Sequence, residues 1–211
     1  NSYVVLIMKN ILNRINSLLI LIFFFSSQSF AEKNDFLLAQ ANHTINVKHD
    51  KKTTQRFNEW ENILFHSLGK STDEKLKLVN NFFNKMKWSD DKKIWNKKDY
   101  WATPIESLNK NSGDCEDFSI AKYFTLLAMD IPEKQLRVTY VILDNGQGHM
   151  VLFYYPDDHS EPLVLDNMRN DILKKSQRSD IKYKFSFNDE GLWLKGNYSS
   201  VPDGKNIITK W

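Results

Sequence analysis

The segment from Glu116 to Met129 constrains the fold more than any other part of the sequence. It has the length of a helix, and its apolar residues fall on two adjoining helical faces instead of one stripe. A helix that is apolar over so much of its circumference must be covered on several sides, so we expect the buried central helix of a domain. The two faces consist of Phe118, Ala121, Phe124 and Ala128, and of Ile120, Tyr123 and Leu127.

Two amphipathic helices are expected before this central helix. The first begins with Thr53 or Thr54 as its cap, and Gly69 ends it after Leu68. The second follows Ser71-Thr-Asp-Glu74, which has the spacing of a capping box, and ends near Lys87.

After the central helix the apolar residues change to the alternating period of strands. Helices followed by an antiparallel meander predict an α+β domain. Between the second helix and the central helix, residues 88–112 are expected to be irregular apart from one helical turn at 105–108. The expected strands cover residues 136–143, 149–155, 163–166, 182–187 and 192–194.

The N-terminus has the pattern of a secretory signal. Lys9 and Arg14 precede a short apolar run, and small residues, Ser29 and Ala31, stand where a signal peptidase reads the chain. Residues ahead of Met8 read as an upstream extension. Because the apolar run is short for a transmembrane helix, a cleaved signal is favoured over an uncleaved anchor.

The chain of 211 residues is therefore expected to have three parts. Residues 1–31 are the signal peptide with its upstream extension, residues 32–52 a flexible polar leader, and residues 53–211 one domain. The mature protein is expected to be exported and not embedded in the membrane. The formal net charge is only +3, with Lys interspersed among Asp and Glu, so no nucleic-acid partner is expected.

Cys115 is the only cysteine, so no disulfide forms within the chain. A lone thiol in an oxidising compartment calls for a reason, either burial as a small apolar group or catalysis. Cys115 opens the central helix directly after a Gly-Asp turn. The positive end of the helix dipole is expected to lower the pKa of the thiol, and the free N–H groups there suit an oxyanion.

His149 and Asp166 are the candidate partners of this thiol. His149 begins a strand after a Gly-rich turn, and Asp166 ends the next strand. If these strands pair antiparallel, the two side chains become neighbours, and the carboxylate holds one imidazole nitrogen while the other faces the thiol. A surface histidine and a turn-forming aspartate are the alternatives.

Taken together, four segments resemble one family, the bacterial transglutaminase-like cysteine proteinases of the LapG type. The resemblance extends from about Trp60 to about Trp193. The four segments are Asp99-Tyr-Trp-Ala-Thr-Pro-Ile-Glu106, Gly113-Asp-Cys-Glu-Asp-Phe-Ser-Ile-Ala-Lys-Tyr-Phe124, Gly148-His-Met-Val-Leu152 and Pro162-Leu-Val-Leu-Asp-Asn167.

The resemblance implies a papain/transglutaminase-like core and a catalytic triad, with Cys115 as nucleophile, His149 as base and Asp166 as orienting acid. It further implies a periplasmic endopeptidase that cuts a large repetitive surface adhesin near its N-terminus, beside paired alanines, and so promotes biofilm dispersal. An inner-membrane receptor for cyclic di-GMP is implied as the inhibitory partner.

Calcium is also implied by the resemblance, with Asp114 and Glu116 as ligands. Read from the residues alone, Asp114 is a helix cap, and Glu116 and Asp117 complement the helix dipole. Calcium prefers several hard oxygen ligands, which acidic residues around one turn supply, and Asp117 is a possible further ligand.

Two other functions remain open at this point. A transglutaminase uses the same three residues but passes the acyl group to an amine instead of water. A binding module could keep the fold without catalysis, although an intact Cys-His-Asp set speaks against that.

The position of the signal leads to a first test. We expect the exported form to begin near Glu32, because Ser29 and Ala31 meet the peptidase's demand for small residues. N-terminal sequencing of the periplasmic protein measures this. A membrane-bound form that starts at Met8 would instead mean an anchor.

Overall fold

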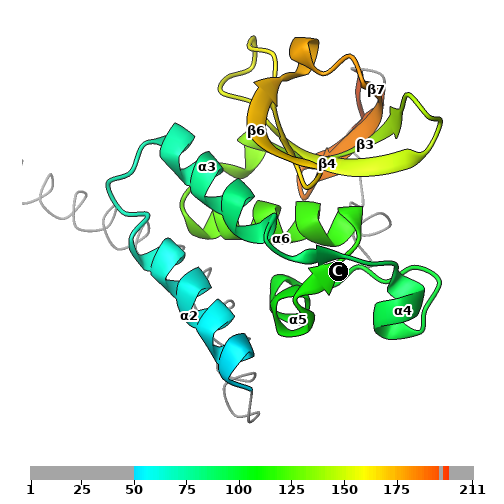
Figure 1. Cartoon of the computed structure of the whole chain (residues 1–211). Coiled ribbons are helices and arrows are strands. Elements are labelled where there is room, and N and C mark those ends of the chain that lie inside the picture. The colour runs from blue at the N-terminus through cyan, green and yellow to red at the C-terminus, as the bar shows by residue number, and fades with distance from the viewer. Residues whose placement is uncertain (1–49, 195–196, 200–211) are drawn as a thin grey trace, which may run out of the picture. The chain divides into compact units, whose positions relative to one another are not determined.

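Helix α6 (Cys115–Ala128) is the buried helix that the apolar pattern predicted, and it lies between the sheet and helices α2 and α5 (Figure 1). The computed structural model describes residues 50–194 and 197–199. The predicted signal and all of the predicted leader before Asp50 lie outside these residues. Within the described parts of the chain, no helix is long and apolar enough to cross a membrane.

Helix α2 (Lys51–Phe65) begins and ends earlier than predicted. Asp50 is its N-cap, because the Asp50 carboxylate accepts the Thr53 N–H at 2.8 Å. The cap predicted at Thr53 or Thr54 was therefore wrong. The helix is tied to the core by Trp60, whose indole N–H donates to the Thr125 hydroxyl at 3.0 Å.

Helix α3 (Thr72–Phe83) has the capping box that its sequence predicted. The helix ends at Phe83, short of the predicted Lys87, because the chain leaves it to form strand β1 (Lys87–Trp88). That strand pairs in parallel with β2 (Ser112–Gly113). The short ladder joins the end of α3 to the turn before Cys115.

The segment predicted to be irregular apart from one helical turn at 105–108 contains two short helices. Helix α5 (Pro104–Lys110) includes the predicted turn, whereas α4 (Asp91–Trp95) was not predicted. Helix α5 has a second capping box, in which the Glu106 carboxylate accepts the Thr103 N–H at 2.9 Å and the Thr103 hydroxyl accepts the Glu106 N–H at 3.3 Å. The signal for it, Thr-Pro-Ile-Glu, is present in the sequence.

The strands form a seven-stranded antiparallel sheet in the order β6-β5-β4-β3-β7-β8-β9, which confirms the α+β class. The sheet is not one continuous meander, because β7 pairs with β3 and not with β6. Strands β6 and β9 were not predicted. The strands and 3-10 helices are η1 (Glu133–Gln135), β3 (Leu136–Leu143), β4 (Gly148–Tyr154), β5 (Leu163–Asp166), β6 (Arg169–Lys174), η2 (Lys175–Gln177), β7 (Ile181–Asn188), β8 (Gly191–Leu194) and β9 (Asn197–Ser199).

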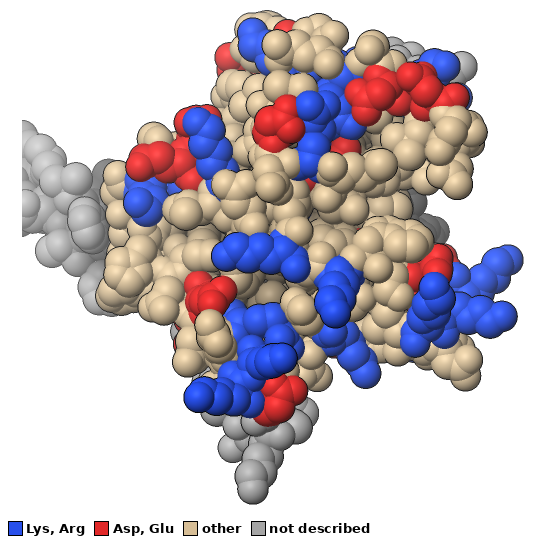
Figure 2. Space-filling view, in the orientation of Figure 1, with Lys and Arg blue, Asp and Glu red and all other residues tan. Residues whose placement is uncertain are grey.

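The sheet has its own apolar core, and the crossing from β6 to β7 passes over it through η2 (Figure 1). Both signs of charge lie side by side over the sheet, whereas Lys and Arg prevail over the helices in the view of Figure 2. The core residues of the sheet are Val141, Val151, Phe153, Val164 and Ile181, with Leu143, Tyr155 and Tyr183 packed against them.

Candidate active site

Cys115 is the first residue of α6, and its side chain is half-buried. The turn before it is held by Asp117, whose carboxylate accepts the N–H of Ala102 at 2.7 Å and the N–H of Asp114 at 3.3 Å. Gly113 is required there, because a Cβ at this position would lie 2.6 Å from the Cβ of Asp117. The sequence thus builds a tight turn that presents the thiol at the helix end.

His149 and Asp166 are neighbours, as the strand order predicted. Strands β4 and β5 pair antiparallel, and His149 Nε2 lies 2.8 Å from Asp166 Oδ1. Both side chains are buried. Hydrogen bonds from His149, from the Met168 N–H and from Arg178 hold the pKa of Asp166 well below its usual range, although burial alone raises it. An ionised carboxylate only accepts hydrogen bonds, so the proton of the imidazole sits on Nε2.

Cys115 meets this pair through Met150, the residue that follows His149. The backbone N–H of Met150 lies close enough to Cys115 to act on the pKa of the thiol, and α6 packs against β4. Because Asp166 engages Nε2, Nδ1 is the imidazole nitrogen left for a partner. The structure therefore pairs His149 with Asp166 and places Cys115 next to the strand that carries His149.

The pKa of the Cys115 thiol differs from the expectation. Burial and then the carboxylate of Glu116 raise the pKa of Cys115, and Asp114 adds to the effect. The thiol donates to Glu116 Oε2 at 3.1 Å. The prediction of a lowered pKa considered only the helix end, and in the structure burial and neighbouring carboxylates outweigh that effect.

Carboxylates gather around the thiol in two overlapping groups that share Asp91. One group consists of Asp91, Asp114 and Asp117, and the other of Asp91, Asp99 and Glu116, with ligand atoms within 4.8 Å of one another in each. The two predicted metal ligands, Asp114 and Glu116, thus fall in different groups. Both groups are suitable for holding a metal ion.

Asp91 is the residue that sequence reasoning missed. Its side chain is 3% exposed, and its Oδ2 accepts the Tyr100 N–H. Asp91 lies at the start of α4, far from Cys115 in the sequence and in a segment with no clear period. An acid there resembles any helix-start residue, so only the fold identifies it.

The chemistry of these carboxylates fits a cation. Asp91 Oδ1 and Asp114 Oδ1 are buried without a hydrogen-bond partner in the described residues. Burial, followed by the charge of Glu116, raises the pKa of Asp114 to about 9, and burial raises the pKa of Asp117 to about 7. Buried carboxylates that repel each other and keep free oxygens are suited to a hard divalent ion.

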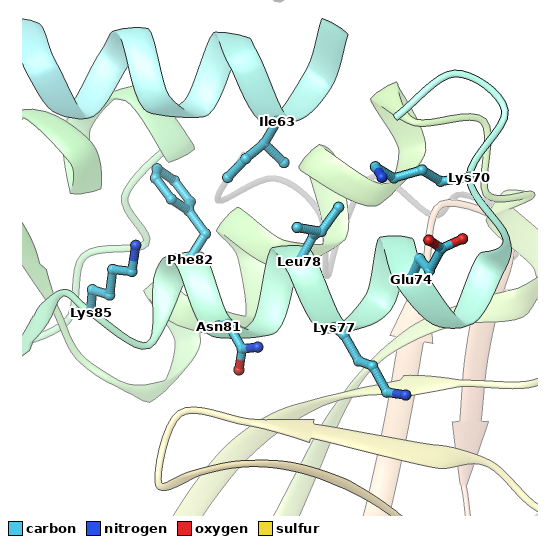
Figure 3. Close-up of a pocket in the computed structure, with 8 residues that line it drawn as sticks. All are labelled: Ile63, Lys70, Glu74, Lys77, Leu78, Asn81, Phe82 and Lys85. Carbon is cyan, nitrogen blue, oxygen red and sulfur yellow. The ribbon is translucent and has the colours of Figure 1, made fainter. Parts of the chain in front are cut away.

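A pocket of about 350 Å³ lies elsewhere, between α2 and α3 (Figure 3). Ile63, Leu78 and Phe82 point into it, and lysines stand around its rim. None of its lining residues belongs to the triad or the acidic groups. The candidate active site is therefore recognised here by its chemistry.

Similarity to known proteins places the chain in a family. The bacterial transglutaminase-like cysteine proteinase family, BTLCP, matches residues 57–195. Among curated proteins, none matches significantly.

Solved structures of LapG from Legionella pneumophila are similar over most of their length. One is 42% identical with a TM-score of 0.68, and the alignment covers 76% of this chain and 86% of that one. A calcium-bound form is 40% identical with a TM-score of 0.67, covering 81% and 90%. An EGTA-treated form is 41% identical with a TM-score of 0.68, covering 77% and 88%.

The fold and the cysteine-bearing helix thus define a papain/transglutaminase-like protein. The chain belongs to the bacterial transglutaminase-like cysteine proteinases and is similar to LapG.

The buried pair predicts how stability responds to Asp166→Asn. At pH 7 we expect the free energy of unfolding to fall by on the order of 3 kcal/mol, because Arg178 loses a buried charged partner. Asp166 has a depressed pKa in the folded protein, so its contribution is present above the unfolded pKa of about 3.9 and is lost as pH falls. Urea titrations should show that the difference in free energy of unfolding between the wild type and Asp166→Asn shrinks below about pH 4.

Asp171→Asn serves as the control for this measurement, because Asp171 is exposed and pairs with Arg169 at the surface. We expect little change in stability at any pH for that variant. A gap for Asp166→Asn that is constant between pH 7 and pH 3 would contradict the account of Asp166 as a buried ionised group.

Proposed function

We propose that this protein is a calcium-dependent periplasmic cysteine endopeptidase, with Cys115 as nucleophile, His149 as base and Asp166 as the acid that orients His149. The observation that carries the proposal is the His149–Asp166 pair beside the thiol-bearing end of α6. Family membership and the similarity to LapG support a protease.

The chemistry follows the places of the three side chains. His149 Nδ1 takes the thiol proton, and the sulfur attacks the carbonyl carbon of the scissile peptide. The C–N bond breaks as His149 returns the proton to the leaving amine. Water then attacks the thioester carbonyl while His149 takes its proton, the C–S bond breaks to release the acid product, and His149 returns the proton to the Cys115 sulfur. The N–H groups at the start of α6 are suited to the oxyanion of each step.

Calcium is part of the proposal because the acidic groups fit it. Asp91, Asp114 and Glu116 would hold the ion, with Asp117 and Asp99 beside them. When bound, calcium supplies positive charge that offsets the crowded carboxylates next to Cys115. A calcium-bound LapG structure, from a protein 40% identical to this chain, supports the choice of metal.

Substrate, location and regulation rest on the family resemblance and the N-terminal sequence. The proposed substrate is the N-terminal region of a large repetitive surface adhesin, cut near paired alanines to release it and promote biofilm dispersal. The proposed inhibitory partner is an inner-membrane receptor that responds to cyclic di-GMP. Export through the signal at residues 1–31 would place the enzyme beside both.

Cleavage of a purified adhesin N-terminal fragment tests the proposal. Cys115→Ala should fold normally and leave the fragment intact, and His149→Ala should be as inactive, since residues that act as one unit are not additive. Asp166→Asn should retain more activity, because the amide still positions the ring in part. Gel analysis and mass spectrometry of the products measure the cut.

A Cys115→Ala variant that still cleaves would overturn the nucleophile. Adding a primary amine separates hydrolysis from acyl transfer: an amine-linked product in place of the free acid would assign a transglutaminase. An intact fragment with the wild-type protein and calcium would reject the proposed substrate.

Removal of calcium is a separate test. We expect a chelator to abolish cleavage reversibly, with calcium restoring it and magnesium doing so poorly, because magnesium demands a tighter octahedral shell. Asp114→Ala, Glu116→Ala and Asp91→Asn should each weaken calcium binding in calorimetry and reduce cleavage. Calcium at 100 times its Kd should stabilise the wild-type protein by about 2.7 kcal/mol.

Asp73→Asn is the matched control, since Asp73 lies at the surface of α3 in an exposed pair with Lys77. It should bind calcium and cleave like the wild type. If Asp114→Ala or Glu116→Ala cleaves normally in chelator, calcium has no part in this active site.

A further inference from the structure

Arg178 is a buried cation directly behind the proposed catalytic residues. It follows η2, in the crossing from β6 to β7, and its side chain is 2% exposed. Buried guanidinium groups need charged partners. Arg178 Nη2 donates to Asp166 Oδ2 at 2.8 Å. Arg178 also donates to Asp180, from Nε to Oδ1 at 2.8 Å and from Nη2 to Oδ2 at 2.7 Å.

The two oxygens of Asp166 have separate tasks. Oδ1 faces His149 Nε2 at 2.8 Å and accepts the Met168 N–H at 3.0 Å, whereas Oδ2 is taken by Arg178. A carboxylate pinned at one oxygen still turns about its Cβ–Cγ bond. Pinned at both oxygens, it keeps Oδ1 aimed at the imidazole within the narrow limits that catalysis needs.

Asp180 offsets the positive charge of Arg178. Arg178 alone would neutralise Asp166 and leave no net negative charge for an imidazolium at His149. Asp180 is half-exposed and binds the Nε–Nη2 edge of the guanidinium, sharing Nη2 with Asp166, so the two acids and Arg178 together keep one negative charge. Lys122 of α6 also interacts with the charge of Asp166, but burial lowers the pKa of Lys122 to about 7, so it adds less positive charge than Arg178. The contribution of Arg178 is therefore orientation more than charge.

We propose that Arg178, itself held by Asp180, is a positioning residue that fixes the Asp166 carboxylate and thereby the ring and tautomer of His149. The catalytic effect of this role rests on the proposed protease function. The structural effect does not, and it is measured without any substrate.

Proton NMR of the calcium-loaded protein labelled with ¹⁵N-histidine is the first test. The wild type should show one slowly exchanging ring N–H signal that His149→Gln removes. In Arg178→Met this N–H should exchange with water at least about tenfold faster, whereas Arg178→Lys, which still reaches Asp166, should be intermediate. Lys77→Met removes an exposed cation that pairs with Asp73 on α3, and it should leave the signal unchanged.

A double-mutant cycle with Asp166→Asn is the second test, read on cleavage of the adhesin fragment. Arg178→Met should lower kcat by about tenfold or more with KM within about twofold, and should add little in the Asp166→Asn background. Asp180→Asn should give a smaller loss of kcat by the same route.

The outcomes separate this proposal from the wider function. An unchanged His149 signal in a folded Arg178→Met, or losses of kcat that multiply in the double variant, would overturn the role of Arg178. If Arg178→Met does not fold, Arg178→Lys and Asp180→Asn carry the same two measurements, and an unchanged signal in both refutes the role. If the wild type leaves the fragment uncut, the proposed substrate fails while the NMR result still decides on Arg178.

Discussion

The burial of one ionised carboxylate, that of Asp166, is the constraint to which the rest of the site is adapted. A charge in the interior is tolerated only when hydrogen bonds surround it. Strand β4 supplies His149, the turn after β5 supplies the Met168 N–H, and the crossing to β7 supplies Arg178. Helix α3 closes the group by donating the Asn84 amide to the Asp166 carbonyl at 2.9 Å.

A second set of acids lies close to the thiol and has the opposite electrostatic character. Around Asp166, cations and N–H groups hold the carboxylate ionised. Around Asp91 and Asp114, carboxylates face one another and leave oxygens without partners in the described part of the chain. Glu116 accepts the thiol hydrogen of Cys115. The proposed calcium ion would offset the negative charge of these carboxylates, so the ease with which the Cys115 thiol ionises would depend on the ion.

Much of this could be predicted from the sequence because the signals are local. The capping box at Ser71, the apolar faces of α6 and the strands that carry His149 and Asp166 each follow from a few adjacent residues. Strand β6 was missed because its sequence, Arg-Asn-Asp-Ile-Leu-Lys, is that of an exposed edge with little apolar alternation. Asp91 and Arg178 were missed for a different reason. Their roles depend on partners that only the folded chain brings near.

The spacing of the contacts at Asp166 also bears on how the chain folds. Asp166 lies 17 residues from His149 and 12 from Arg178, whereas its link to Asn84 spans 82 residues. Closing a loop costs more entropy as the loop lengthens, and contacts distant in sequence slow folding. The acid, imidazole and guanidinium can therefore assemble within one local hairpin region, before the docking of α3 completes the domain. The geometry around Asp166 therefore depends mainly on loops much shorter than the one that joins Asp166 to Asn84.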